Sequence, residues 1–279
     1  MSVGELLNTS GSTDEGGLPS SKFPKSVRRQ KHTGWFTDTL VLFLSPAILV
    51  LLWEYFSQNG TINPSVLPSP LTIWETFVQM LLSGELAKHL GISLLRVAQG
   101  YTIGCVLGII FGTLMGLVRK FDRVFTLIFG IIRPVPVIAW VPVVILWLGI
   151  GETSKISVIA LGTFFPVLLN TIQGIQSTDE KYREVAEVLE KSRWSRLNHV
   201  IFPCALPSIF TGLRVGLGTA WMSVVGAELI AASSGIGYLI SYAGQLSQPD
   251  VMLVGVFTIG VIGLLIDVCI KLVQNKVLR

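Results

Sequence analysis

The chain has 279 residues, of which 51% are hydrophobic and 14% are charged, and its formal net charge is +4. A globular chain usually carries about 25% charged residues, so this composition excludes an ordinary water-soluble domain. Long apolar runs instead predict an all-α polytopic membrane protein embedded in a lipid bilayer.

Residues 1–34 are polar and rich in Ser and Gly, and they end in a basic cluster that includes Arg28 and Arg29. No short apolar core with a small-residue cleavage site follows Met1, so this segment does not resemble a signal peptide. We expect a disordered cytoplasmic tail whose basic cluster reflects membrane topology, with no nucleic acid as a partner. Residues 35–279 are then the transmembrane domain.

About six transmembrane helices are predicted after this tail. Their approximate ranges are 37–57, 89–118, 124–148, 155–175, 208–231 and 251–273. Between the first two lies a segment, 63–82, whose apolar residues recur at helical spacing: Trp74, Phe77, Val78, Leu81 and Leu82. This pattern predicts a short amphipathic helix that lies in the membrane interface.

The distribution of Lys and Arg outside the spans predicts the orientation. One side collects sixteen of these residues, from the N-terminal tail, residues 119–123, residues 181–196 and the C-terminal end. The other side has only Lys88 and Lys155. Because cytoplasmic loops carry the excess of basic residues, both termini are predicted to be cytoplasmic, as is the segment around 181–196.

Two spans carry unusual small or helix-breaking residues. The second span has glycine at every fourth position, a repeat that lets helices approach closely: Gly100, Gly104, Gly108, Gly112 and Gly116. The third span contains Pro134, Pro136 and Pro142, each of which removes a backbone donor. A broken helix that lines a translocation pathway and a purely structural kink both remain open for these prolines.

Ionisable residues also occur within or near the spans. They are Glu54, Arg96, Arg133, Arg214, Glu228 and Asp267. A charge at the bilayer centre costs about 2.5–3.5 kcal/mol on insertion scales, so such groups usually face the interior of the bundle. Arg133 and Arg214 are predicted at similar depth, where they either neutralise an anionic solute or pair with a carboxylate such as Glu228 or Asp267.

Residues 177–207 form a charged stretch between apolar spans. Ser177 is followed three residues later by Glu180, which is typical of a capping box at a helix start. Pro203 and Pro207 are expected to stop helical continuation. Such a helix between membrane spans predicts a docking surface for a partner outside the bilayer.

Catalytic chemistry finds little support in the sequence. The three histidines, His32, His89 and His199, lie in the tail or at span edges, so no Ser–His, two-His or paired-Asp arrangement occupies a span. The chain also lacks the GxxxxGK[ST] pattern of an ATP site. We therefore expect no catalytic residue, no metal site and no cofactor bound by this chain.

The 177–207 stretch resembles the cytoplasmic loop of inner-membrane permease subunits of binding-protein-dependent ABC importers. Their pattern is Glu-Ala-Ala, three residues, Gly, and about nine residues to Ile-x-x-x-Pro. Glu184-Val-Ala186 matches its start, and Ile201, Pro203 and Pro207 match its end. Glu190 stands in place of the family's Gly, which predicts a straighter connection between two short helices.

The resemblance covers nearly the whole chain from about residue 37. Residues 133–156 and 210–240 are similar to taurine permeases, and residues 67–70 and 83–101 to permeases for aliphatic sulfonates. Permeases for nitrate, bicarbonate and pyrimidine precursors belong to the same branch. The resemblance implies a type I ABC importer permease fold and import of a small anionic solute, most plausibly taurine or another aliphatic sulfonate, across the bacterial inner membrane.

The resemblance also implies the partners and the mechanism. Such permeases dimerise, receive solute from an extracytoplasmic binding protein at loops that correspond to 57–88 and 233–250, and dock two ATPase subunits that hold ATP and Mg. Transport proceeds by alternating access. The implied ATPase-coupling residues are Asp179, Tyr182, Glu184, Val185, Ala186, Leu189 and Glu190. The candidate pathway residues are Arg133, Pro134, Pro136 and Arg214.

Two other classes remain as alternatives. An ATP-independent channel or carrier would have no use for the docking pattern in 177–207. A membrane-embedded enzyme would need a nucleophile, base or metal ligands within the spans.

Overall fold

The computed structural model describes residues 35–60, 63–178 and 192–277. The chain falls into two compact units divided between Leu49 and Val50, and the second unit contains all the helices discussed below except the first part of α1. The helices are α1 (Trp35–Gln58), α2 (Pro70–Leu82), α3 (Glu85–Leu117), α4 (Arg119–Ile132), η1 (Val137–Trp140), α5 (Val141–Leu148), α6 (Glu152–Gln176), α8 (Arg193–Arg196), η2 (Leu197–Ile201), α9 (Phe202–Ala231), α10 (Ile236–Gln245) and α11 (Pro249–Val277). The described part of the chain is therefore all-α, as predicted.

Four stretches of the described chain are long and apolar enough to cross a membrane. Three are α3, α6 and α11, and the fourth, Trp194–Gln245, includes α9. A fifth arises if α4 and the η1–α5 segment count as one span, although these two parts are bent by 89°. The expected break at the prolines of the 124–148 segment is therefore confirmed, and the segment is not one continuous helix.

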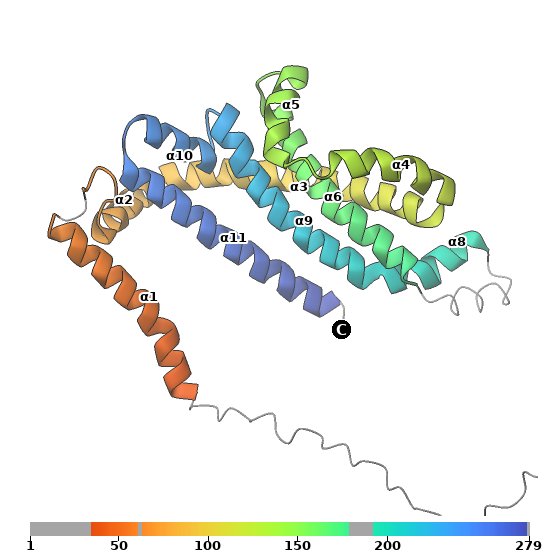
Figure 1. The fold of residues 1–279 in the computed structure, drawn as a ribbon, viewed down its shortest axis with the longest axis horizontal. Coiled ribbons are helices and arrows are strands. Elements are labelled where there is room, and N and C mark those ends of the chain that lie inside the picture. Colours follow the sequence, from red (N-terminus) through yellow and green to blue (C-terminus); the bar gives the residue numbers. More distant parts are fainter. Residues whose placement is uncertain (1–34, 61–62, 179–191, 278–279) are drawn as a thin grey trace, which may run out of the picture. The chain divides into compact units, whose positions relative to one another are not determined.

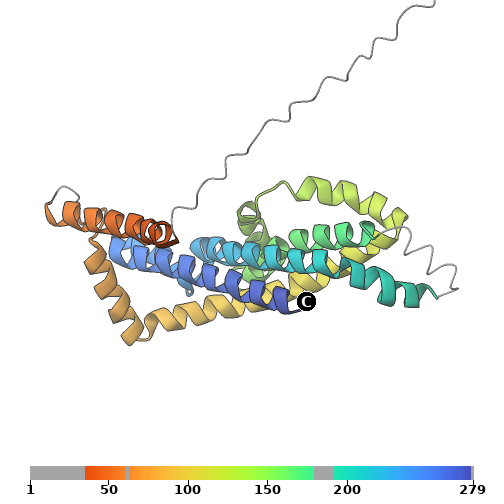
Figure 2. The same cartoon turned by 90° about the horizontal axis from the view of Figure 1, so that it is seen from below.

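Helices α3 and α6 pack in parallel along most of their length, and α9 lies beside them (Figures 1 and 2). The α3 glycine repeat faces a matching four-residue repeat on α6. A Cβ atom added at Gly104 would lie 2.6 Å from the Ala160 carbonyl oxygen, and one at Gly112 would lie 2.6 Å from Thr171 Cβ. These distances are too short for any side chain, so the repeat sets how closely the two helices approach.

Helix α9 packs antiparallel to α6 by the same means. Gly162 of α6 faces Ser223 near the end of α9, and Gly174 of α6 faces Ala205 near its start. Residues 179–191 connect the end of α6 to α8, which leads into α9. The opposite end of this three-helix core, where α6 begins and α9 ends, is called the distal end below.

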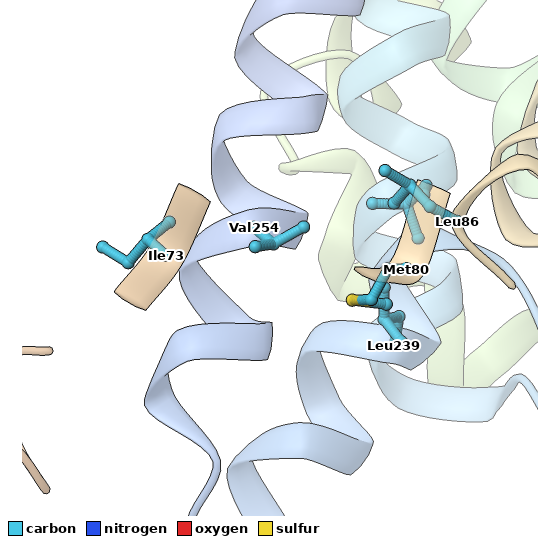
Figure 3. Close-up of a cluster of buried hydrophobic side chains, with 6 residues drawn as sticks. Ile73, Met80, Leu86, Leu239 and Val254 are labelled. Carbon is cyan, nitrogen blue, oxygen red and sulfur yellow. The ribbon is translucent and has the colours of Figure 1, made fainter. Parts of the chain in front are cut away.

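A second apolar cluster joins α2, the start of α3, α10 and α11 (Figure 3). Its buried members include Met80 of α2, Leu86 of α3, Leu239 of α10 and Val254 of α11. Helix α2 lies within the predicted segment 63–82, and its start is capped by the Ser69 hydroxyl, which accepts a hydrogen bond from the Thr72 N–H at 3.1 Å.

Pro203 and Pro207 do not stop the helix, and that prediction is wrong. Pro203 lies in the first turn of α9, and Pro207 lies inside it. Just before them, η2 is a π-helix, in which the Phe202 N–H donates to the Leu197 carbonyl. This wider turn ends just before Pro203 and accommodates its missing N–H, and the helix then continues through Pro207.

Two further local predictions need revision. Ser177 ends α6, with its hydroxyl donating to the Gly174 carbonyl at 3.1 Å, and its expected capping partner Glu180 lies outside the described residues. The segment 233–250, expected as a loop, contains the ten-residue helix α10. The start of α10 is held by side chains from α3 and α9.

Candidate functional site

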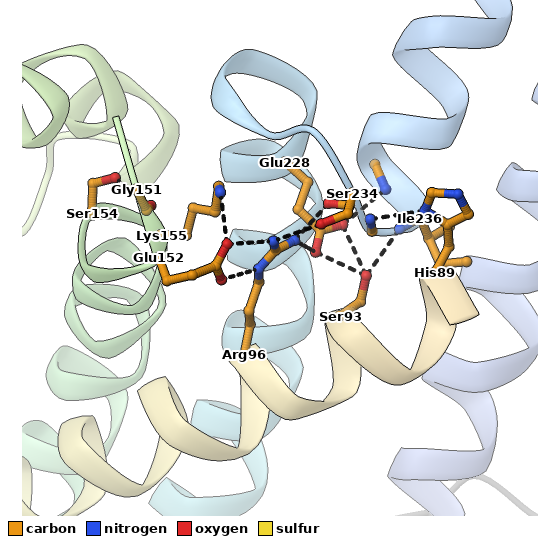
Figure 4. Close-up of polar contacts among 12 residues, drawn as sticks. His89, Ser93, Arg96, Gly151, Glu152, Ser154, Lys155, Glu228, Ser234 and Ile236 are labelled. Atoms are coloured by element: carbon orange, nitrogen blue, oxygen red, sulfur yellow. Dashed lines mark hydrogen bonds and ion pairs between the residues drawn. The ribbon is translucent and has the colours of Figure 1, made fainter. Parts of the chain in front are cut away.

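Arg96 of α3 is the centre of a buried polar network at the distal end of the core (Figure 4). Its guanidinium donates five hydrogen bonds, which equals its number of N–H groups. Two go to the Glu152 carboxylate at 2.6 and 2.7 Å, one to Glu228 at 2.8 Å, and two to the carbonyl and hydroxyl of Ser234. Arg96 thus joins α3 to α6, α9 and the loop before α10.

The Glu228 carboxylate is fully buried and receives several donors besides Arg96. The Ser93 hydroxyl lies 2.8 Å from it, and the Gly237 N–H donates to it at 2.9 Å. Gly235 has a φ of +110°, and a Cβ there would overlap the Glu228 carboxyl group. Gly237 therefore donates its N–H to this carboxylate and Gly235 leaves space for it, while the Gly235 N–H donates to His89 Nδ1 at 3.0 Å and Ser93 accepts from the Ile236 N–H at 2.9 Å.

Glu152 differs from Glu228 because its side chain is 58% exposed. It is the first residue of α6, where a negative charge is favoured by the helix dipole. Besides Arg96 it pairs with Lys155, whose Nζ lies 3.0 Å from the carboxylate and whose side chain is 6% exposed. The two buried cations, Arg96 and Lys155, are thus both paired with the exposed Glu152 carboxylate, and Arg96 is also paired with the buried Glu228 carboxylate.

Sequence reasoning noted Arg96 and Glu228 as ionisable residues in spans, but it did not predict that they pair. The 233–238 segment, Ser-Ser-Gly-Ile-Gly-Tyr, is Gly-rich but has no strand before it and no Lys, so its sequence does not indicate a phosphate-binding loop. Gly235 and Gly237 follow Glu228 by no more than nine residues, and this spacing was the sequence feature that could have indicated a contact between the loop and the carboxylate.

The candidate pathway residues of the third span lie at the break between α4 and η1. Arg133 follows the last residue of α4, and Pro136 precedes the first residue of η1. The side chains of Arg133, Pro134 and Pro136 are exposed, and Arg133 forms no ion pair with any residue that the structure describes.

Arg214 of α9 lies in a different setting. Its guanidinium forms a bidentate pair with Asp267 of α11, with both hydrogen bonds at 2.9 Å. Of the two carboxylates considered from the sequence, Asp267 is therefore its partner, while Glu228 pairs with Arg96. Both members of the Arg214–Asp267 pair are partly exposed.

The predicted ATPase-coupling residues lie outside the described residues. They are Asp179, Tyr182, Glu184, Val185, Ala186, Leu189 and Glu190. The described chain brings the ends of their flanking helices together, since Gly174 of α6 packs on Ala205 of α9. Within the described ranges, no group of three or more His, Cys, Asp or Glu side chains is arranged to hold a metal ion.

Long apolar helices packed through glycines, with ionised side chains paired in their interior, define a polytopic helical membrane protein. Two solved structures share its fold. An inward-facing form of the methionine ABC transporter MetNI matches with a TM-score of 0.59 and 18% identity, over 67% of this chain and 93% of that chain. An amino acid ABC transporter with histidines matches with a TM-score of 0.61 and 17% identity, over 72% of this chain and 98% of that chain.

Proteins related by sequence share a higher identity with this chain than these two structures do. SsuC of Bacillus subtilis (strain 168), named for aliphatic sulfonate transport, is 40% identical over 95% of each chain. The taurine transport system permease protein TauC of Escherichia coli (strain K12) is 36% identical over 82% of this chain and 86% of that one. The nitrate import permease protein NrtB of Synechocystis is 33% identical over 83% and 86%.

Residues 104–279 match the family described as "Binding-protein-dependent transport system inner membrane component", and the chain belongs to this family. It is a multi-pass permease subunit of an ABC importer in the inner membrane, as the sequence resemblance implied. The permease is not itself an enzyme, because ATP is bound by the partner ATPase, and a solute-binding protein is the other partner of such a system.

Proposed function

We propose that this permease imports a small anionic solute, most plausibly taurine or another aliphatic sulfonate. The observation that carries the proposal is the similarity to SsuC and TauC, at 40% and 36% identity over most of the chain. Nitrate is the second candidate, because NrtB is 33% identical over a similar range. Taurine, the other aliphatic sulfonates and nitrate all carry a negatively charged oxyanion group, so this group is the shared part of the proposal.

The assembly we propose is a homodimer of six-span subunits with both termini in the cytoplasm. Helix α1 supplies the first span in addition to the four or five found by length and composition. The sixteen basic residues on one side, against Lys88 and Lys155 on the other, support this orientation. Residues 179–191 then face the cytoplasm, and the distal end faces outward.

Coupling to the ATPase is assigned to residues 177–207, with Ala186 at its centre. Helices α6 and α9, which flank this stretch, pack on each other through Gly162, Gly174, Gly212 and Gly216. Because interfaces packed this closely move as a unit, a displacement of the coupling stretch would move both helices together. That movement would alternate access between the two sides of the membrane.

The pathway is assigned to the broken helix around Arg133, Pro134 and Pro136, with Arg214 as a second cation. An exposed arginine within a span needs water or a counter-ion, and non-helical backbone at membrane depth needs protein or a water-filled cavity. Arg133 is exposed and lies at the α4–η1 break, so both requirements apply to it. Arg214 is neutralised by Asp267, so its part in anion passage would require that this pair opens.

Uptake by the complete transporter in proteoliposomes tests the substrate. Labelled taurine and ethanesulfonate should be imported with ATP, and excess nitrate or bicarbonate should compete weakly. Strong inhibition by nitrate together with nitrate uptake would transfer the assignment to the second candidate.

Arg133→Ala tests the pathway. It should lower taurine uptake at least ten-fold while the assembled complex is recovered in normal amount. Arg123→Ala is the matched control, since Arg123 is an exposed arginine within helix α4, ten residues before Arg133 at the end of that helix. Equal loss of uptake and assembly in Arg133→Ala, or full uptake, would reject the pathway role.

A further inference from the structure

The two carboxylates of the distal network have different roles because they differ in exposure. Glu228 is enclosed by Arg96, Ser93 and the Gly237 N–H, and it has no route to solvent in this arrangement. It permanently neutralises one buried cation. Glu152 neutralises the second, but its side chain is 58% exposed.

Turning Glu152 toward solvent would leave the network with an unbalanced positive charge. Arg96 would keep Glu228 but lose the two hydrogen bonds of Glu152, from Nε and Nη2. Lys155 would lose the one side-chain partner that the structure describes for its ammonium group. A rotation of the Glu152 side chain is enough for this change, so no movement of helix α6 is needed.

The backbone beside these cations also favours an anion. Helix α6 has 25 residues, and its N-cap residue Gly151 offers no side-chain oxygen to the N–H groups of the first turn. Such groups carry the positive end of the helix dipole. The Ser234 hydroxyl lies 3.1 Å from Arg96 Nη2 and adds a neutral polar group to the same place.

We propose that Arg96, Lys155, Ser234 and the first turn of α6 form an anion-binding site that the Glu152 carboxylate occupies in this structure. The ligand is a small organic sulfonate, whose charged oxygens replace those of Glu152. The guanidinium edge made by Nε and Nη2 already holds two oxygens of one carboxylate, and a sulfonate presents two oxygens in the same way with a third for Lys155. The identity of this ligand rests on the proposed function.

The Glu152 carboxylate acts as a tethered competitor for this site. A group on a short tether has an effective concentration on the order of millimolar, so a free anion must compete with it. The site is consequently weak while Glu152 is charged, which suits a step through which a solute passes. Removing the charge of Glu152 should therefore strengthen anion binding. If the Glu152 ion pairs only stabilised the fold, the same change would weaken them and would not strengthen anion binding.

The test is calorimetric titration of sodium ethanesulfonate into the full-length permease with its ATPase in lipid nanodiscs. Glu152→Gln should bind ethanesulfonate at least ten-fold more tightly than the unmodified protein. Adding Lys155→Gln to Glu152→Gln should remove that gain, while Arg96 and Glu228 keep the fold intact. Glu75→Gln is the control, because Glu75 is an exposed glutamate on α2 with no described partner, and it should leave binding unchanged.

Equal binding by Glu152→Gln and the unmodified protein would overturn the proposal. A gain that persists with Lys155→Gln, or one that sodium chloride shows equally, would overturn it too. The outcome is separable from that of the proposed function. Import of nitrate in place of taurine, with the ethanesulfonate gain present, would reject only the substrate; import of taurine without the gain would reject only this site.

Discussion

The close contact between α3 and α6 at Gly104 makes a sharp prediction for Gly104→Ala. The added Cβ would lie 2.6 Å from the Ala160 carbonyl oxygen and 2.6 Å from Thr163 Cβ. Ordinary contacts between carbon atoms are about 3.5–4.0 Å, so α3 and α6 would have to separate by roughly 1 Å. Overpacking of this kind costs about 1–3 kcal/mol, so we expect the free energy of unfolding to fall by that amount relative to a glycine-to-alanine change in the same helix that meets no clash.

Gly91→Ala is the matched control because Gly91 lies in the same helix α3 and a Cβ there meets no atom within 4 Å. Replacing glycine by alanine inside a helix is worth about 0.8–1.0 kcal/mol when no clash occurs. The control should therefore keep or raise stability, while Gly104→Ala lowers it. The two substitutions share the same chemistry, so their difference isolates the contact between helices.

Equilibrium unfolding of the purified permease in detergent or nanodiscs measures both variants. Thermal unfolding should rank the stabilities of the two variants in the same order, and it is a simpler first measurement. If Gly104→Ala proved as stable as Gly91→Ala, the close α3–α6 contact would be wrong, and so would the inference that these helices move together.

Three further predictions concern the charged groups and the coupling stretch. Glu228→Gln should lower the free energy of unfolding by about 3–5 kcal/mol, because it leaves Arg96 buried without its buried counter-ion; an unfolding curve that matches the unmodified protein would contradict the network. Arg214→Gln should slow transport more than Asp267→Asn if Arg214 serves the anion, and equal effects in an uptake assay would leave only a structural pair. Ala186→Asp should abolish co-purification with the ATPase and ATP-driven uptake, and normal values of both would show that the coupling assignment is wrong.

The sequence predicted features that depend on local pattern. The four-residue glycine repeat from Gly100 to Gly116 predicted a close helix contact, because residues four positions apart lie on one face of a helix. The prolines between Arg133 and Val137 predicted the break in the third span for an equally local reason, the loss of backbone donors.

Other features depend on contacts between distant residues, and these were missed. Arg96, Glu152 and Glu228 come from three helices, and nothing in their spacing shows that they meet. The continuation of α9 through Pro203 depends on the π-turn before it, which has no clear sequence signal. Helix α10 is short and Gly-rich at its start, and side chains from α3 and α9 hold it in place.

ATP-driven uptake by the reconstituted transporter tests the central claim most directly. Proteoliposomes that contain the permease, its ATPase and its binding protein should accumulate labelled taurine or ethanesulfonate only when ATP is supplied to the ATPase side. Uptake that is equally fast without ATP, or that fails for every small anion tested while the complex hydrolyses ATP, would contradict the account of this chain as an anion importer permease.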